Sequence, residues 1–130
     1  MGSEPASGRR AVARGHIVMS AETVSRIAAN TLAKGDVLGT ARFAAILAAK
    51  SASSFLALTP STTPRSTSVE FSLNGSTVEV EVTVVARDLD GDGVAMSALS
   101  AATVATLTIY DMCKSADRSM SIGPVQLVSH

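Results

Sequence analysis

An aspartate and a lysine, Asp111 and Lys114, stand three residues apart in a segment that is otherwise mostly apolar. If the segment is helical, side chains at this spacing lie on one face, and the two opposite charges are neighbours. On a buried face such a pair can form a site, because desolvation and nearby charges turn a lysine into a proton carrier near neutral pH. On an exposed face the same pair is an ordinary ion pair near a helix C-terminus.

Three more basic residues, Arg9, Lys34 and Lys50, could contribute to the same chemistry. Lys34 comes just before a predicted helix start, where free backbone N–H groups and the helix dipole already favour an anion. Lys50 stands at the predicted end of that helix. Scattered lysines are most often simply solvated, but this set suits a phosphorylated small molecule.

The sequence contains no complete set of metal ligands at a recognisable spacing. Residues 88–93 begin like a calcium-binding loop, but the twelfth position, which should hold a bidentate acid, is Leu99. His16 and His130 have no cysteine or carboxylate at zinc-ligand spacing. We therefore predict no metal site and no cofactor, and interpret His16 as a strand side chain and residues 88–93 as a polar turn.

The composition narrows the classes of partner. Eleven basic residues balance eleven acidic ones, which removes the long-range field that nucleic-acid binding relies on. With no Trp, one Tyr and three Phe, the chain also lacks aromatic platforms for base stacking. No uninterrupted run of apolar residues predicts a membrane span, and the first ten residues have no apolar signal core. We expect neither a nucleic-acid partner nor membrane association.

At 130 residues the chain is long enough for one domain with its own core. We expect a flexible N-terminal arm at residues 1–8 and a single domain at residues 9–130. The lone Cys113 cannot close a disulfide within the chain, and its apolar surroundings suit a buried thiol in a reducing compartment, the cytoplasm. The abundance of small residues leaves little aromatic surface for an isolated core, so subunits are expected to share part of it.

Alternation of apolar and polar residues predicts four strands, which cover residues 9–19, 69–73, 78–84 and 120–127. Between the second and third strands, Asn74-Gly75 predicts a type I′ hairpin turn, since both residues tolerate a positive φ. The prolines and small polar residues of 59–68 predict a loop before this hairpin. Pro124 suits an edge strand.

Three further segments have helical periodicity. Ser20 is predicted to cap a short helix that ends near Asn30, and Asp36 to cap a second helix that ends at Lys50. The second helix is apolar almost all round, so several of its sides should be buried. A long third helix is predicted over residues 94–115. The resulting order is the βαββαβ pattern of an α+β, ferredoxin-like fold, an antiparallel sheet with helices packed on one face.

A series of motifs runs through this predicted framework. They are Lys34-Gly35-Asp36-Val37, Ala41-Arg42, residues 46–50, Gly93-Val94, Ala98-Leu99, Tyr110-Asp111-Met112-Cys113-Lys114 and Gly123-Pro124-Val125. From about Arg9 to the end, the chain closely resembles the cyclic pyranopterin monophosphate synthase (MoaC) family of molybdenum cofactor biosynthesis. Motifs of this length at matching spacing indicate a shared fold, and the family's ferredoxin-like fold agrees with the predicted pattern.

The resemblance implies a function and an assembly. Family members form hexamers, as trimers of dimers, with the pocket at a dimer interface. They act as lyases, converting a cyclised GTP-derived triphosphate to cyclic pyranopterin monophosphate with release of pyrophosphate. By position, Lys34 and Lys114 correspond to the principal catalytic lysines; Asp111 would orient Lys114, and Arg9 and Lys50 would bind anionic oxygens. The implied partners are a phosphorylated pterin or purine ligand and further copies of this chain.

The chain departs from the family at four positions. Pro60 replaces the histidine of a Pro-Leu-Cys-His-Pro segment, and Ala95 and Ser97 replace both glutamates of a Gly-Val-Glu-Met-Glu segment. His130 aligns with a lysine. Because the loss of several members of a concerted set costs orders of magnitude in rate, we predict that activity is reduced or lost.

Two alternatives stay open. The chain could be a non-catalytic subunit that binds a nucleotide or pterin phosphate, or that pairs with an active paralogue. It could also be a fully active enzyme in which His130 and Arg65 replace the missing groups.

Overall fold

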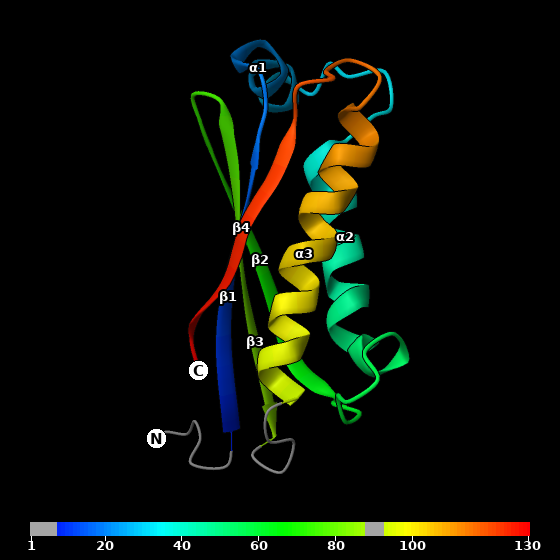
Figure 1. Ribbon diagram of the computed structural model, residues 1–130, viewed down its shortest axis with the longest axis vertical. Coiled ribbons are helices and arrows are strands. Elements are labelled where there is room, and N and C mark those ends of the chain that lie inside the picture. Colours follow the sequence, from blue (N-terminus) through cyan, green and yellow to red (C-terminus); the bar gives the residue numbers. More distant parts are fainter. Residues whose placement is uncertain (1–7, 88–92) are drawn as a thin grey trace.

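The structure, a computed structural model, describes residues 8–87 and 93–130. It confirms the α+β, ferredoxin-like fold. A four-stranded antiparallel sheet has the order β2-β3-β1-β4, and helices α2 and α3 cover one of its faces (Figure 1). The elements are β1 (Gly8–Val18), α1 (Ala21–Ala29), α2 (Val37–Lys50), the 3-10 turn η1 (Ala52–Ser54), β2 (Pro64–Asn74), β3 (Thr77–Arg87), α3 (Gly93–Cys113) and β4 (Ser121–Ser129).

Small residues let the long helix α3 pack closely on the sheet. The fully buried side chains of this layer include Val78, Val80, Val82 and Val84 of β3 and Ala98, Ala101, Ala102 and Ala105 of α3. Gly15 in β1 allows the approach, since a Cβ there would lie only 3.3 Å from the carbonyl oxygen of Ala102. The packing fixes α3 against the sheet, and its C-terminal end carries Asp111.

Helix α3 is long and apolar enough, by length and composition, to cross a membrane. Serines and threonines interrupt its apolar residues, so the sequence contains no continuous apolar run at this helix. More than half of its residues are buried in the protein core, which it shares with the sheet and α2. A helix that is hydrophobic on several sides is typical of such a central position.

The predicted helix caps are confirmed. Ser20 Oγ accepts a hydrogen bond from the backbone N–H of Thr23 at 3.2 Å, and Asp36 Oδ1 accepts one from Gly39 at 3.0 Å. Asn30 ends α1 in the left-handed conformation, with φ 57°. Asn30 and Asp36 therefore define the two ends of the short connection, residues 30–36, between α1 and α2.

Two predictions for the hairpin and the loop before it are wrong. Residues 64–68 belong to β2 and pair with β3 rather than forming a loop, because the sheet partner satisfies their backbone whatever their polarity. Asn74 pairs with Thr77 as the last residue of β2, and Gly75, with φ 60°, begins the turn. A positive φ at Gly75 but not at Asn74 or Ser76 fits a type II′ turn rather than type I′.

Several other predictions can be compared with the described residues. His16 lies in β1 and Cys113 is fully buried, both as predicted, and β4 is an edge strand. The predicted arm at 1–8 lies outside the described residues except for Gly8, which begins β1. The predicted turn at 88–93 lies outside them except for the first residue of α3.

Candidate functional site

Asp111 and Lys114 form an ion pair at the C-terminal end of α3. The Lys114 ammonium donates to the Asp111 carboxylate and, at 3.1 Å, to the backbone carbonyl oxygen of Asp111. The helical neighbour pair predicted from the spacing is therefore confirmed. The two side chains are 70% and 52% exposed, respectively, so within one subunit the pair does not lie on a buried face.

The neighbouring lysines favour the ionised form of Asp111. The hydrogen bond from Lys114 lowers the pKa of the Asp111 carboxyl most, the charge of Lys114 lowers it further, and the charge of Lys34 adds to the effect. Lys34 therefore lies within electrostatic reach of the pair, although it comes from a distant part of the sequence.

The connection between α1 and α2 carries Lys34 to this end of the molecule. Leu32 is buried and anchors the connection, while Gly35 turns the chain with φ 103°. Lys34 stands exposed between them. Figure 1 shows this connection at the same end of the molecule as the C-terminus of α3. We call the group of Lys34, Asp111 and Lys114 the lysine end.

Two surface hollows flank Lys114. One has a volume of about 390 Å³ and is lined by Leu107, Thr108, Tyr110, Asp111 and Lys114. The other has a volume of about 430 Å³ and is lined by Tyr110, Lys114, Ser115, Asp117 and Arg118. Together they offer apolar and aromatic surface beside cationic groups, the combination that a flat phosphorylated heterocycle requires.

Comparison with known proteins identifies the family. The MoaC family model matches residues 1–130. The chain belongs to the MoaC family. Relatives named cyclic pyranopterin monophosphate synthase are 44% identical in Roseiflexus sp. (strain RS-1) and 41% identical in Roseiflexus castenholzii (strain DSM 13941 / HLO8), each over 128 residues that make up 98% of this chain and 81% of the relative. A relative of the same name from Thermoanaerobacter sp. (strain X514) is 42% identical over 120 residues, 92% of this chain and 76% of its own length.

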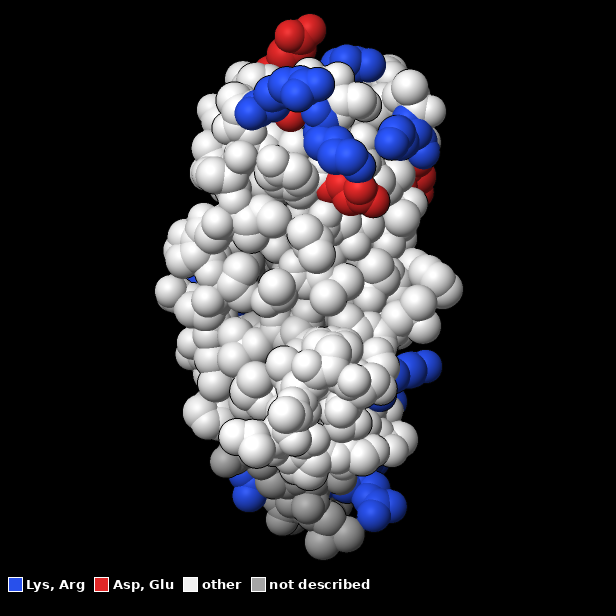
Figure 2. All heavy atoms as spheres, turned by 45° about the vertical axis from the view of Figure 1, so that its right-hand side comes forward, with Lys and Arg blue, Asp and Glu red and all other residues white. Residues whose placement is uncertain are grey.

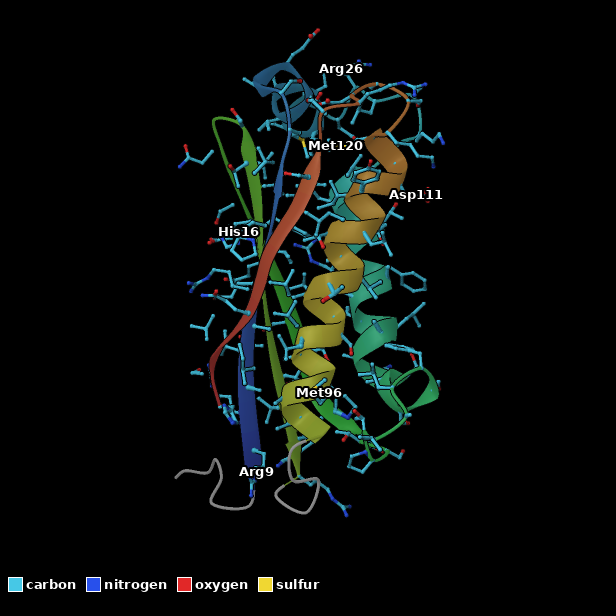
Figure 3. All side chains as sticks on the ribbon, in the orientation of Figure 1. Arg9, His16, Arg26, Met96, Asp111 and Met120 are labelled. Atoms are coloured by element: carbon cyan, nitrogen blue, oxygen red, sulfur yellow. The ribbon has the colours of Figure 1, made fainter. Side chains whose placement is uncertain are left out.

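The remaining predicted site residues of this MoaC-family chain lie at the opposite end of the molecule. Arg9 stands near the start of β1, far from Asp111 (Figure 3). Lys50 ends α2, beside the start of α3 (Figure 1). Since α3 has 21 residues, it is about 30 Å long. One small ligand therefore cannot contact both groups within a single subunit. We call the end with Arg9 and Lys50 the arginine end.

The positions at which this chain departs from the family motifs also lie at the arginine end. Ala95 and Ser97 are buried in the first two turns of α3. A Cβ built on Gly93 would lie 3.5 Å from the carbonyl oxygen of Pro60, so Pro60 borders the start of the same helix. His130 follows β4, whose C-terminal end points the same way (Figure 1). The lysine end therefore keeps its predicted residues, and the arginine end holds the replacements.

Two residues that line the hollows were not predicted from the sequence. Tyr110 borders both hollows, and Arg118 adds a cation to the second. Two sequence features could have identified them. Tyr110 is the sole tyrosine and directly precedes Asp111, and Arg118 follows Lys114 by four residues. Within residues 8–87 and 93–130, no three side chains are grouped so that they could hold a metal ion.

Proposed function

We propose that this chain acts in molybdenum cofactor biosynthesis and binds a phosphorylated pterin or purine at the lysine end. The observation that carries the proposal is that the ion pair of Asp111 and Lys114 lies beside two hollows, with Lys34 close enough for its charge to act on Asp111, in a chain of the MoaC family. Relatives named cyclic pyranopterin monophosphate synthase support this proposal. The reaction we assign is the one that the family resemblance implies, in which a cyclised GTP-derived triphosphate is rearranged with release of pyrophosphate.

Each group at the lysine end has a role that its chemistry suits. Lys34 and Lys114 supply positive charge for an anionic ligand, and a lysine that a bound ligand desolvates can also transfer a proton. Asp111 accepts the hydrogen bond of Lys114 and thereby orients the ammonium. Ionised Asp111 also offsets one of the two lysine charges before the ligand arrives.

The site is completed in a homo-oligomer, in which the arginine end of a second subunit brings Arg9 and Lys50 to the ligand. An exposed apolar surface on the helix layer supports such an assembly. Phe43, Leu47 and Leu107 are 64%, 50% and 54% exposed, respectively. Figure 2 shows a broad face with few charged side chains between the charged ends. Large exposed patches of this kind mark interfaces between proteins.

Turnover is reduced relative to an intact family member. A proton-transfer group contributes typically about 10²–10⁴-fold to a rate. Pro60, Ala95 and Ser97 have no side chain that titrates near neutral pH, so they cannot replace a histidine and two carboxylates. Binding depends on dispersed positive charge, which the chain retains, and is therefore affected less than catalysis.

A second candidate function is supported by the separation of the two ends. A subunit with an intact lysine end and an altered arginine end could pair with an active paralogue. In such a pair, each lysine end faces the arginine end of the other subunit. One of the two resulting sites would then combine this chain's lysines with the paralogue's complete arginine end. In this case the chain is an assembly subunit whose own homo-oligomer is nearly inactive.

Pyrophosphate release from the cyclised GTP intermediate, compared with the rate of an intact family member, tests the first proposal. We expect this chain to bind the intermediate in calorimetry and to release pyrophosphate at least roughly a hundredfold more slowly. Absence of any binding would refute the ligand site. A rate equal to that of the intact enzyme would refute the reduced activity and would favour recruitment of His130 and Arg65.

A further inference from the structure

Asp117, which lies just beyond the lysine end, has the most extensive hydrogen bonding of any carboxylate in the described residues. It is only 7% exposed. Its Oδ2 accepts hydrogen bonds from the backbone N–H of Ser20 at 2.9 Å and from Thr23 Oγ1 at 2.8 Å. Its Oδ1 accepts from the backbone N–H of Ser119 at 2.8 Å and from Ser119 Oγ at 2.6 Å.

These contacts join two parts of the chain that are distant in sequence. Ser20 and Thr23 form the N-cap and first turn of α1, the helix that leads into the connection with Lys34. Asp117 itself belongs to the turn after α3, which begins with Lys114. That turn is held by hydrogen bonds from the backbone N–H groups of Ala116 and Asp117 to the carbonyl oxygen of Cys113.

We propose that Asp117 is a positioning residue that sets the placement of Lys34 relative to Lys114 by clamping the start of α1 to the end of α3. The inference rests on the proposed function, because it assigns these two lysines to one ligand. Asp117 borders the second hollow, but both of its carboxylate oxygens are engaged by protein donors. It acts through the two segments that carry the lysines.

The chemistry of the clamp requires a carboxylate. All four contacts are donors, so both oxygens of Asp117 must accept. The hydrogen bonds, with those of Ser119 and Ser20 foremost, hold the pKa of the Asp117 carboxyl far below its usual range, and the group stays ionised. Charge-assisted hydrogen bonds of this kind are shorter and stronger than neutral ones. An asparagine would turn an NH₂ group toward one pair of donors and lose that side of the clamp.

A matched pair of variants separates the two sides of the clamp. Thr23→Val removes the hydrogen bond from α1 to Asp117, together with the one between the hydroxyls of Thr23 and Ser20, with little change of shape. Ser119→Ala removes a hydrogen bond within the turn itself. Asp117→Asn loses the hydrogen bonds of whichever pair of donors the new NH₂ group faces. If Asp117→Asn does not fold, the Thr23 and Ser119 variants still decide the question.

Spin labels at the exposed positions Ala33 and Ser115, next to the two lysines, report the separation of the segments. Cys113 is changed to serine in all proteins, and labelled chain is refolded with an excess of unlabelled chain so that each assembly carries one labelled copy. We expect Thr23→Val and Asp117→Asn to broaden the distance distribution, and Ser119→Ala to leave it unchanged. An unchanged distribution in the folded Thr23→Val and Asp117→Asn variants would overturn the proposal.

Ligand affinity gives the second readout. The probe is GTP, and we expect roughly tenfold weaker binding in Asp117→Asn and Thr23→Val but not in Ser119→Ala, at temperatures where all three are folded. Broadened distances with unaltered GTP affinity would overturn the positioning role. If the unmodified chain binds neither GTP nor the cyclised intermediate, the proposed function fails. The distances between the spin labels would still decide whether Asp117 holds the two segments together.

Discussion

Lys114 reaches back one helical turn and bonds both the carboxylate and the backbone carbonyl oxygen of Asp111. The last carbonyl groups of a helix have no partner within the helix and attract cations. The ammonium is therefore held by the end of α3 as well as by the carboxylate. Because both side chains are largely exposed, the pair contributes little to stability, and its main effect is to orient Lys114.

Loss of this oriented charge should weaken ligand binding. We expect Lys114→Ala to reduce the affinity for the cyclised GTP intermediate by about 1–3 kcal/mol, the range for a charge-assisted contact. Isothermal titration calorimetry measures the change. Lys114→Arg keeps the charge and should lose less, and the thermal stability of both variants should stay close to that of the unmodified chain. Identical affinity in the alanine variant would remove Lys114 from the site.

Contacts between residues close in sequence, such as this pair, could be predicted from the sequence. Spacing alone placed Asp111 beside Lys114, and the caps at Ser20 and Asp36 were correct because hydroxyl and carboxylate oxygens satisfy local backbone N–H groups. Burial of the pair could not be predicted, since it depends on what packs over the outer side of α3. The strand at 64–68 was missed for a related reason, because pairing with β3 overrides a loop-like composition.

The link from Asp117 to α1 was missed because its partners there are remote in sequence. Ser20 and Thr23 lie more than 90 residues earlier, at separations of 97 and 94 residues. Local spacing contains no signal for such a contact. The division into a lysine end and an arginine end was equally hidden, because the sequence places Ala95 in the same helix as Asp111 and only the length of α3 separates them.

Restoring the replaced side chains should recover activity. We expect the triple change Pro60→His, Ala95→Glu and Ser97→Glu to raise pyrophosphate release from the cyclised intermediate by at least roughly tenfold, since each acid–base group contributes about 10²–10⁴-fold when it is well placed. The recovery depends on the oligomer, because Ser97 is 1% exposed within one subunit and an unpaired carboxylate there would be costly. Lys114→Ala in the same background is the control and should abolish the gain.

The apolar surface of the helix layer predicts the assembly. Light scattering at micromolar concentration should return a multiple of the 13.2 kDa chain mass. Phe43→Asp combined with Leu47→Asp should reduce that mass, because it puts two charges into the buried interface. A monomer of the unmodified chain would contradict the predicted oligomer.

Asp117 also predicts a pH dependence of stability. Its pKa is lowered in the folded state, and an unfolded aspartate titrates near pH 3.9. Its contribution is therefore fully present above the unfolded pKa and is lost as the pH falls toward the folded value. Urea unfolding should show that the difference in unfolding free energy between the unmodified chain and Asp117→Asn is largest at about pH 6 and shrinks below about pH 4. A difference that stays constant over this range would mean that ionisation of Asp117 does not stabilise the fold.

The separation of the two ends predicts complementation between subunits. An intact family member whose lysine equivalent to Lys114 is changed to alanine has a defective lysine end and a complete arginine end. Co-refolding it with this chain creates interfaces that pair this chain's Lys34 and Lys114 with the other protein's histidine and glutamates. We expect pyrophosphate release from the mixture to exceed the sum of the two separate proteins by at least roughly tenfold, given what one catalytic group contributes. Lys114→Ala in this chain is the control and should cancel the gain. If mixed oligomers form, as mass spectrometry can verify, and no activity appears, the ends do not combine across subunits and the assembly-subunit function is excluded.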